Sequence, residues 1–314
     1  AYSQKTAYLI GDGRGHVSEF DQYFVLEACE YRRHFLEYKP EMAIMTNFEI
    51  DHVDYFKSEE DYLRAYEDFS RNVKELLVVW GEDPHFSKLN LKTPRVWTYG
   101  FTKDMDISAQ NVQRLRERSV FDVYFKGEKI HRFNLPIVGD HMILNALATI
   151  AIGLNENIDP HLIEAGLQGF EGAIRRFVVE EGQDNVYIDD YAHHPTEVDV
   201  TLKAVRQRYP DHQIVAVFKP HRSGRLQYFA KEFSESLSQA DKVYLVPFSS
   251  IDDFDDGADV DVDYLIPHIR GSEILQEDAN AVTRLAQHSP CVYVFMSSKD
   301  IYHLLDELKR FFND

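Results

Sequence analysis

Short apolar runs and helix-spaced apolar residues alternate along the chain, and their arrangement changes near Phe177. In the first half the runs predict buried strands, because a few consecutive apolar residues between polar ones suit a sheet interior. The predicted strands are Thr6–Ile10, Tyr23–Leu26, Ala43–Met45 and Leu77–Trp80. Residues 119–135 predict a hairpin that turns at Lys126–Lys129.

Three helices are predicted in the same half. Between Ser58 and Leu76 apolar residues recur at three- and four-residue steps, and Ser58 with Asp61 resembles a capping box. Residues 142–149 predict a second helix. A third begins at Asp159-Pro160, since Asp is a favoured N-cap and proline suits the first helical position.

From Phe177 onward strands and helices alternate, which predicts a parallel sheet covered by helices. The order is strand Val186–Asp190, a helix from Pro195, strand Gln213–Phe218, a helix from Leu226, strand Lys242–Pro247, strand Cys291–Met296 and a helix over residues 301–312. The change predicts two α/β domains, residues 1–177 and 178–314. We interpret Asp252–Asp263 as a solvated acidic loop. Gly11–Gly15 predicts a turn, because it matches neither GxGxxG nor a P-loop.

Composition limits the possible partners. The chain has 314 residues and a formal net charge of -19, which argues against nucleic acid or an anionic membrane as a general partner. No apolar run is long enough to span a bilayer. The two cysteines, Cys29 and Cys291, are far apart and favour a reducing, cytoplasmic location. The sequence does not determine the oligomeric state.

The segment Asp189-Asp190-Tyr191-Ala192-His193-His194-Pro195-Thr196-Glu197 concentrates polar chemistry between a predicted strand and a predicted helix. Open α/β sheets bind ligands at the carboxyl ends of their strands, and helix N-termini attract anions. The segment is therefore a candidate site, with Asp190 and His193 as its candidate residues. An ordinary strand-to-helix loop is the alternative.

His221, Arg222 and Arg225 follow the next predicted strand. Guanidinium groups bind carboxylates and phosphates through paired hydrogen bonds, so this segment is a candidate clamp at the same sheet edge. A solvent-exposed basic turn is the alternative. Arg176 precedes the predicted domain boundary, where it either reaches a ligand between the domains or makes an interdomain salt bridge.

Two further groups lie in the first half. Glu27 ends a predicted strand and His52 follows another, so a carboxylate and an imidazole are candidate metal ligands; for His52 a hydrogen-bonded loop residue or a zinc ligand are the alternatives. His141 and Asn145 lie four residues apart on one helix face. An Asn side chain can bind an adenine edge, although spacing alone favours a helix cap with a core polar contact.

Taken together, these residues resemble the Mur ligase family, and within it the alanine-adding branch. The matching segments follow the family's order: Leu9–Gly13, Glu27–Tyr31, Thr46–His52, Gly139–Ala146, Arg175–Phe177, Asp189–Glu197 and Pro220–Arg222. The segments DDYxHHPTE and PHR are the most specific of these.

The resemblance implies a central ATPase domain followed by a Rossmann-like C-terminal domain. The family also has a UDP-binding domain and a GxxGKT-type P-loop, which this sequence does not contain. We therefore expect a partial central P-loop-type domain that lacks its P-loop. As a fragment of this kind, the chain is expected to be inactive alone.

The implied reaction is ATP-driven amide formation between the carboxylate of UDP-N-acetylmuramate and the amine of L-alanine, through an acyl phosphate, in peptidoglycan precursor synthesis. ATP and Mg²⁺ are the implied cofactors. By resemblance, the metal ligands are Glu27 and His52, and the nucleotide contacts are His141, Asn145, Arg176 and Asp190. The residues implied at the acyl and alanine end, with Asp190 also counted as catalytic, are His193, His221, Arg222 and Arg225.

The sequence departs from the family pattern at two of these places. The family usually has Asp at Cys29 and Asn at Met142. Three alternatives stay open: the family's ligase for recycled murein peptide, a non-catalytic nucleotide-binding module, and a metallohydrolase built on Glu27, His52 and the His193-His194 pair.

Overall fold

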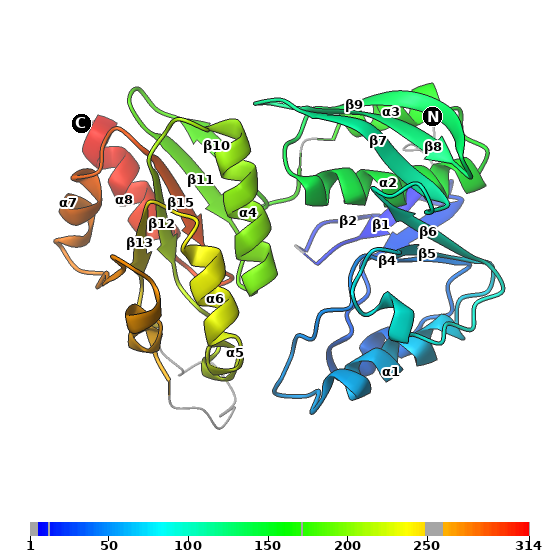
Figure 1. The fold of residues 1–314 in the computed structure, drawn as a ribbon, viewed down its shortest axis with the longest axis horizontal. Coiled ribbons are helices and arrows are strands. Elements are labelled where there is room, and N and C mark those ends of the chain that lie inside the picture. Colours follow the sequence, from blue (N-terminus) through cyan, green and yellow to red (C-terminus); the bar gives the residue numbers. More distant parts are fainter. Residues whose placement is uncertain (1–5, 12, 171, 249–259, 314) are drawn as a thin grey trace.

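The computed structural model describes residues 6–11, 13–170, 172–248 and 260–313. Two α/β units lie side by side, and the segment after α3 connects them (Figure 1). The unit holding the N-terminal half contains a small sheet and a six-stranded sheet, and the other unit contains a second six-stranded sheet. Within the described residues, no helix is both long and apolar enough to cross a membrane.

The small sheet has the order β2-β1-β3. Its strands are β1 Thr6–Leu9, β2 Gly15–His16 and β3 Tyr23–Leu26. The predicted strands at 6–10 and 23–26 are therefore confirmed. Their predicted burial is wrong for Tyr8, Leu9, Phe24 and Val25, which are all exposed because this narrow sheet leaves them uncovered. The predicted glycine turn returns the chain between β1 and β2, with the Ile10 N–H donating to the Arg14 carbonyl; residue 12 lies outside the described part.

The larger sheet of the first unit has the order β4-β5-β6-β7-β8-β9, parallel from β4 to β7 and antiparallel beyond. Its elements are β4 Met42–Met45, β5 Leu76–Trp80, β6 Val96–Gly100, β7 Ile107–Arg114, β8 Ser119–Phe125, β9 Glu128–Leu135, α1 Glu59–Ser70, α2 Asp140–Asn155, α3 Pro160–Gln168 and the 3₁₀ turns η2 Tyr31–Glu37 and η3 Phe86–Lys88. Alternate residues of β5 face opposite layers, because side chains alternate along a strand. Leu77 and Val79 pack in the cluster with α1, whereas Leu76 and Val78 pack in the cluster with α2.

Helix α1 begins as predicted and ends earlier than predicted. The Ser58 Oγ accepts a hydrogen bond from the Asp61 N–H at 3.2 Å, which caps the helix. The helix stops at Ser70, and Leu76 is instead the first residue of β5, paired with Met42. Apolar spacing alone could not separate Leu76 from the helix, since it is equally buried in the strand.

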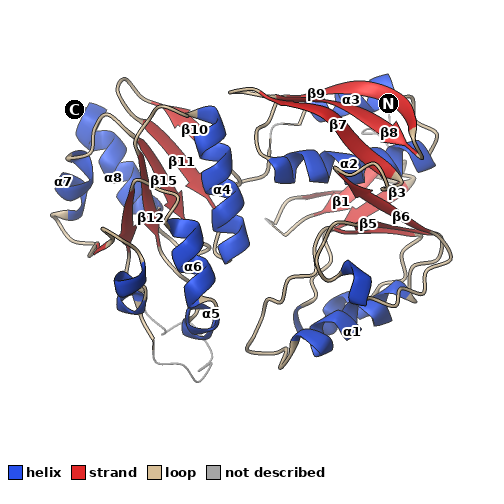
Figure 2. Ribbon diagram, viewed as in Figure 1, coloured by secondary structure: helices blue, strands red, loops and turns tan. Residues whose placement is uncertain are grey.

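The C-terminal unit has a sheet of order β10-β11-β15-β12-β13-β14, in which only the pairing of β10 with β11 is antiparallel. Its elements are β10 Val178–Glu181, β11 Val186–Asp190, β12 Ile214–Phe218, β13 Lys242–Leu245, β14 Glu273–Ile274, β15 Val292–Met296, α4 Pro195–Arg208, α5 Ser223–Tyr228, α6 Ala230–Leu237, α7 Ala281–Ala286, α8 Tyr302–Asn313 and the 3₁₀ turns η5 Val262–Tyr264 and η6 Ile266–His268. Helices α4 and α6 cover one face, and α7 and α8 cover the other (Figure 2).

The predicted α/β alternation of this unit is confirmed, with two corrections. The helix predicted from Leu226 begins at Ser223, so Arg225 lies inside α5 rather than before a helix. Strand β10 adds an antiparallel edge to the predicted parallel sheet. Residues 252–259 of the predicted acidic loop lie outside the described residues.

The cap of α1 gives a stability prediction. Replacing Ser58 with Ala removes the acceptor for the Asp61 N–H, and loss of such a cap costs about 1 kcal/mol. We expect the free energy of unfolding, measured by urea denaturation, to fall by that amount. Ser87→Ala, at an exposed serine outside α1, is the control. Equal stability of the two variants would show that the cap does not hold this helix.

Candidate functional site

The carboxyl ends of three neighbouring strands meet at one edge of the C-terminal sheet. Met296 of β15 pairs with Asp190 of β11 and with Phe218 of β12. The segments that follow these strands therefore begin side by side, and they carry His193, His221 and Arg222. The two candidate segments, which follow β11 and β12, therefore lie at one edge of the sheet, with β15 between their strands.

Glu197 organises the loop between β11 and α4. Its Oε2 accepts hydrogen bonds from the His193 and His194 N–H groups at 2.9 and 3.1 Å, and its Oε1 accepts one from Arg176 at 3.1 Å. Burial alone would raise the pKa of Glu197, but His193 and Arg176 hold that pKa well below its usual range. The carboxylate therefore stays charged and fixes the first turn of α4, with Pro195 at the first helical position as predicted.

Asp190 ties this loop to the connection between the two units. It is 6% exposed, and its two oxygens accept hydrogen bonds from the Phe177 N–H at 2.9 Å and the Ala192 N–H at 2.8 Å. Burial raises the pKa of Asp190 to about 6. Its oxygens are thus engaged by backbone, and the direct nucleotide contact implied for Asp190 stays a prediction.

The two histidines of the sheet edge are each held through Nδ1. His193 Nδ1 lies 2.9 Å from the Tyr191 carbonyl oxygen, and His221 Nδ1 lies 2.9 Å from Ser298 Oγ. A carbonyl only accepts, so Nδ1 of His193 carries the proton and donates it, which leaves Nε2 as an acceptor in the neutral ring. The two ring centroids are 6.4 Å apart.

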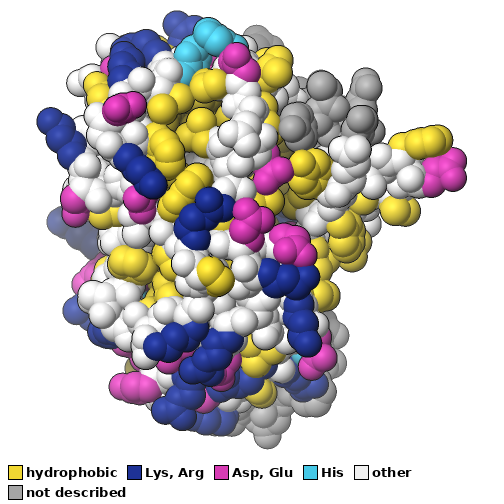
Figure 3. All heavy atoms as spheres, turned by 90° about the vertical axis from the view of Figure 1, so that its right-hand side faces the viewer, with side chains coloured by type: hydrophobic (Ala, Val, Ile, Leu, Met, Phe, Trp, Pro, Cys, Tyr) yellow, Lys and Arg dark blue, Asp and Glu magenta, His cyan; other side chains and the backbone are white. Residues whose placement is uncertain are grey.

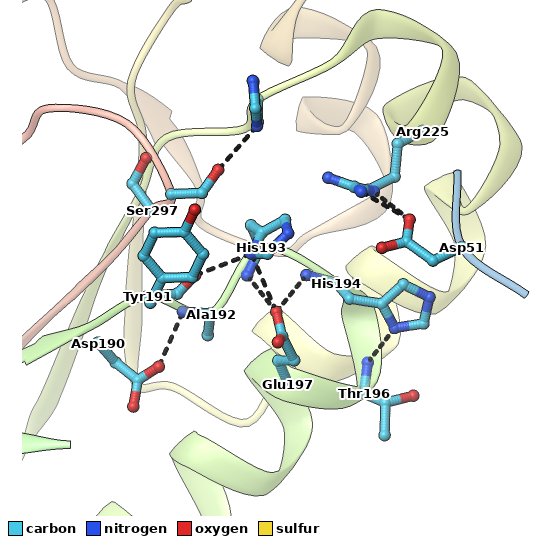
Figure 4. Close-up of polar contacts among 12 residues, drawn as sticks. Asp51, Asp190, Tyr191, Ala192, His193, His194, Thr196, Glu197, Arg225 and Ser297 are labelled. Carbon is cyan, nitrogen blue, oxygen red and sulfur yellow. Dashed lines mark hydrogen bonds and ion pairs between the residues drawn. The ribbon is translucent and has the colours of Figure 1, made fainter. Parts of the chain in front are cut away.

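The first unit supplies acids to this edge through the loop after β4. Arg225 donates from Nε and Nη2 to Asp51 Oδ1 at 2.9 and 2.6 Å, and Arg222 Nη1 lies 2.8 Å from Asp54 Oδ1. Figure 4 shows Arg225 and Asp51 pointing toward each other across the gap between their segments. Burial opposes ionisation of Asp51, but Arg225 and His52 lower its pKa to about 2. The predicted clamp is therefore occupied by carboxylates of the chain itself.

Several buried polar atoms in this region have no hydrogen-bond partner. They are Arg225 Nη1, Arg222 Nε, His194 Nε2 and His52 Nδ1. A buried donor or acceptor without a partner is costly, so such atoms mark places where a ligand, ion or water completes the structure. Their gathering between the two units makes this the candidate active site.

His52 also belongs to a group of metal-ligand atoms. One ligand atom each from Cys29, Glu30 and His52 lies within 4.8 Å of the others, and His52 Nε2 is 3.4 Å from Glu30 Oε1. Glu27, the predicted ligand, is not in this group, and its Oε2 accepts a hydrogen bond from the Gly11 N–H at 2.7 Å. The unpartnered Nδ1 of His52 fits a metal ligand. Glu30 Oε1 and Asp51 Oδ2 lie 3.4 and 4.0 Å from the other ring nitrogen, Nε2.

The predicted nucleotide contacts lie at the start of α2. His141 Nδ1 is buried without a partner, and burial lowers the pKa of His141 to about 4. Asn145 is exposed one turn later, with its Nδ2 3.9 Å from Met142 Sδ. The charge of Arg176 contributes to the lowered pKa of His141, and the same guanidinium donates to Glu197.

Sequence reasoning did not assign roles to Asp51, Asp54 or Ser298. Their position along the sequence could have indicated a role, because each follows a strand whose carboxyl end reaches the site. The pairing of Asp51 with Arg225 joins residues 174 positions apart, which no local pattern reveals.

Comparison with known families agrees with this architecture. The model described as the Mur ligase middle domain matches residues 16–153, and the model described as the Mur ligase glutamate ligase domain matches residues 175–298. These two matches cover most of the chain. The chain therefore belongs to the Mur ligase family, whose members are ATP-dependent ligases of peptidoglycan precursors, and it carries the middle and C-terminal domains of that family.

Solved structures share the fold. UDP-N-acetylmuramate-alanine ligase MurC from Thermotoga maritima is 23% identical, with a TM-score of 0.77 over 99% of this chain and 70% of that chain. MurF ligase from Thermotoga maritima in complex with ADP is 14% identical, with a TM-score of 0.74 over 98% and 73%. The murein peptide ligase Mpl from Psychrobacter arcticus is 18% identical, with a TM-score of 0.67 over 98% and 72%.

The buried His141 gives a pH prediction. Its folded pKa of about 4 lies below the unfolded value of 6.5, so the unfolded chain binds the extra proton and stability rises with pH between those values. The shift corresponds to on the order of 3 kcal/mol. We expect the stability difference between wild type and His141→Asn to shrink by that order from pH 7 to pH 4 in urea unfolding.

The matched control is His268→Asn, at an exposed histidine outside the candidate site. An unchanged wild-type advantage over His141→Asn at both pH values would contradict neutral burial of the ring.

Proposed function

We propose that this protein is an ATP-dependent, ADP-forming amide ligase that adds L-alanine to UDP-N-acetylmuramate in cytoplasmic peptidoglycan precursor synthesis. Residues 1–177 would form its ATP-binding domain, and residues 178–314 would bind the amino acid. Membership in the Mur ligase family supports the reaction class. The arginine clamp supports an amino acid as the acceptor.

The observation that carries the proposal is that Arg222 and Arg225 each have a buried N–H donor without a partner. Both lie at the carboxyl edge of the C-terminal sheet, and both are paired with single carboxylates of the first unit. Arg225 is only 4% exposed, and each guanidinium keeps a buried N–H donor without a partner. A guanidinium in this condition has further capacity for a carboxylate, which is the group that a small amino acid offers besides its amine.

In the proposed reaction, the carboxylate of UDP-N-acetylmuramate takes the γ-phosphoryl group of ATP and ADP leaves. The amine of alanine then attacks the acyl carbon, an amide bond forms and inorganic phosphate leaves. The amine must lose a proton in this step. His193 suits that role, because its Nδ1 faces two acceptors, the Tyr191 carbonyl and Glu197 Oε2, and its Nε2 is left as an acceptor. His221, held by Ser298, lies beside it at the same edge, with the two ring centroids 6.4 Å apart.

The residues present fit the nucleotide and the metal. A magnesium ion neutralises phosphate charge and is usually held by one or two carboxylates and water. His52, whose Nε2 lies 3.4 Å from Glu30 Oε1, and Glu30 would hold it, and Glu27 would be a further ligand by resemblance. His141, Asn145 and Arg176 would contact the nucleotide at the start of α2. Closure of the two units would exclude water from the acyl phosphate.

The first test is a ligation assay with the complete gene product. We expect ADP release that depends on both L-alanine and UDP-N-acetylmuramate. Replacing L-alanine with a murein tripeptide or with D-alanyl-D-alanine should abolish it, which separates this activity from that of a murein peptide ligase and from that of a D-alanyl-D-alanyl ligase. The 314-residue chain, which contains no GxxGK[ST] sequence, should release none. Preference for the tripeptide would replace the proposed activity with peptide recycling.

The second test concerns the clamp. Lysine keeps the charge of Arg222 but not its planar fork, and one charge-assisted hydrogen bond is worth about 1.5–3 kcal/mol. In the complete gene product, Arg222→Lys should therefore raise the KM for alanine about ten- to a hundredfold. The KM for ATP should change little, since the proposed adenine contacts lie in the other unit. A defect confined to ATP would remove Arg222 from the amino acid site.

A further inference from the structure

A second group of metal-ligand side chains lies on the outer side of the first unit, away from the arginine clamp. Ligand atoms of His131, His161 and Glu164 all lie within 4.8 Å of one another. His131 belongs to the edge strand β9, whereas His161 and Glu164 lie three residues apart in α3. Residues three apart share one face of a helix, so two ligands of α3 face one ligand of the strand.

The strand side of this group is shaped by an irregularity in β9. His131 pairs with Val123, but the next partners are Lys129 and Tyr124, so Ile130 is an extra residue in the strand. Such bulges change the direction in which neighbouring side chains point. The ring of His131 packs edge-on against Phe133 at 5.0 Å and against His161 at 4.4 Å between centroids. Its Nε2 lies 2.8 Å from Glu164 Oε2.

The two residues of α3 are held by hydrogen bonds that do not involve Glu164 Oε2 or the imidazole of His161. Glu164 Oε1 accepts from the Asn134 N–H at 2.9 Å and from Gln168 Nε2 at 3.3 Å, which orients the other oxygen toward His131. The backbone N–H of His161 is bound by the N-cap Asp159 at 2.8 Å. Metal sites depend on contacts of this kind, because they orient the ligands before the ion arrives.

We propose that His131, His161 and Glu164 form a zinc-binding site that joins β9 to α3. Two imidazoles and one carboxylate are a ligand set that zinc takes, with water in the fourth position. In a tetrahedral zinc site the ligand atoms are about 3.4 Å apart, so the present spacings require movements on the order of 1 Å. The side chains of His131 and Glu164 are 17% and 19% exposed, and His161 is exposed, which gives the ion a path from solvent.

The location indicates a structural role for the ion. Strand β9 is the edge of its sheet, and helix α3 packs on it through Ile163 in the cluster that contains Phe133. A metal here would clamp the free edge strand to the helix that covers it. Figure 3 views this side of the molecule and shows histidine side chains at the surface near its top.

The test is a zinc titration of the metal-free 314-residue chain in competition with a chromophoric chelator. The Cys29→Ala/His52→Ala background removes the other ligand group, so one zinc per chain should remain. In that background His161→Ala and Glu164→Gln should each weaken binding at least tenfold. Gln keeps the acceptor for the Asn134 N–H, so the second variant preserves the fold. His268→Ala, at an exposed histidine outside both groups, should bind zinc like the background.

A second readout locates the ion. Diethyl pyrocarbonate modifies accessible imidazoles, so mass spectrometry should find His161 modified in the metal-free chain and protected by zinc. His268 should be modified equally in both conditions. The proposal is overturned if the background chain binds no zinc, if neither substitution weakens binding, or if zinc leaves the modification of His161 unchanged.

Discussion

The contact between the buried Arg225 and the half-buried Asp51 joins the two units of this protein. Two buried ions are expensive to remove from water, and their attraction offsets that cost only when the hydrogen bonds are well made. Here both donors of one edge of the Arg225 guanidinium reach a single oxygen, and Arg222 adds one ion pair, from its Nη1 to Asp54. The relative placement of the two units, and hence the whole candidate site, depends on these acids meeting those arginines.

The need to bring the two units together accurately also explains why the loop before α4 has so many hydrogen bonds. An interdomain site can be assembled only if each side is rigid before the two meet. Glu197 fixes the backbone of the two histidines, and Asp190 fixes the end of the connecting segment through the Phe177 N–H. These two acids organise the backbone around the candidate catalytic groups.

Local features of the sequence were the most predictable. The start of α4 at Pro195 and that of α3 at Pro160 follow from proline and cap chemistry that acts within a few residues. Strands β6 and β7 were not predicted; in β7, polar residues such as Gln110 and Asn111 interrupt the apolar pattern. The sequence could predict that the site lies at the ends of neighbouring strands. It could not predict that acids of the first unit would pair there with Arg222 and Arg225. Whether Glu27 or Glu30 lies beside His52 depends on how the chain folds after β3, which apolar spacing does not specify.

The order of strands in the C-terminal sheet has a consequence for synthesis of the chain. Strand β15 is the last strand along the sequence, yet it lies between β11 and β12 in the sheet. Strands β11 and β12 therefore have no direct partner in each other, and they must wait until residues 292–296 have left the ribosome. Pairings so distant in sequence form slowly, because a long loop must close first. During translation β11, paired with β10, and β12, paired with β13, consequently each keep one edge without its final partner until most of this unit has been made.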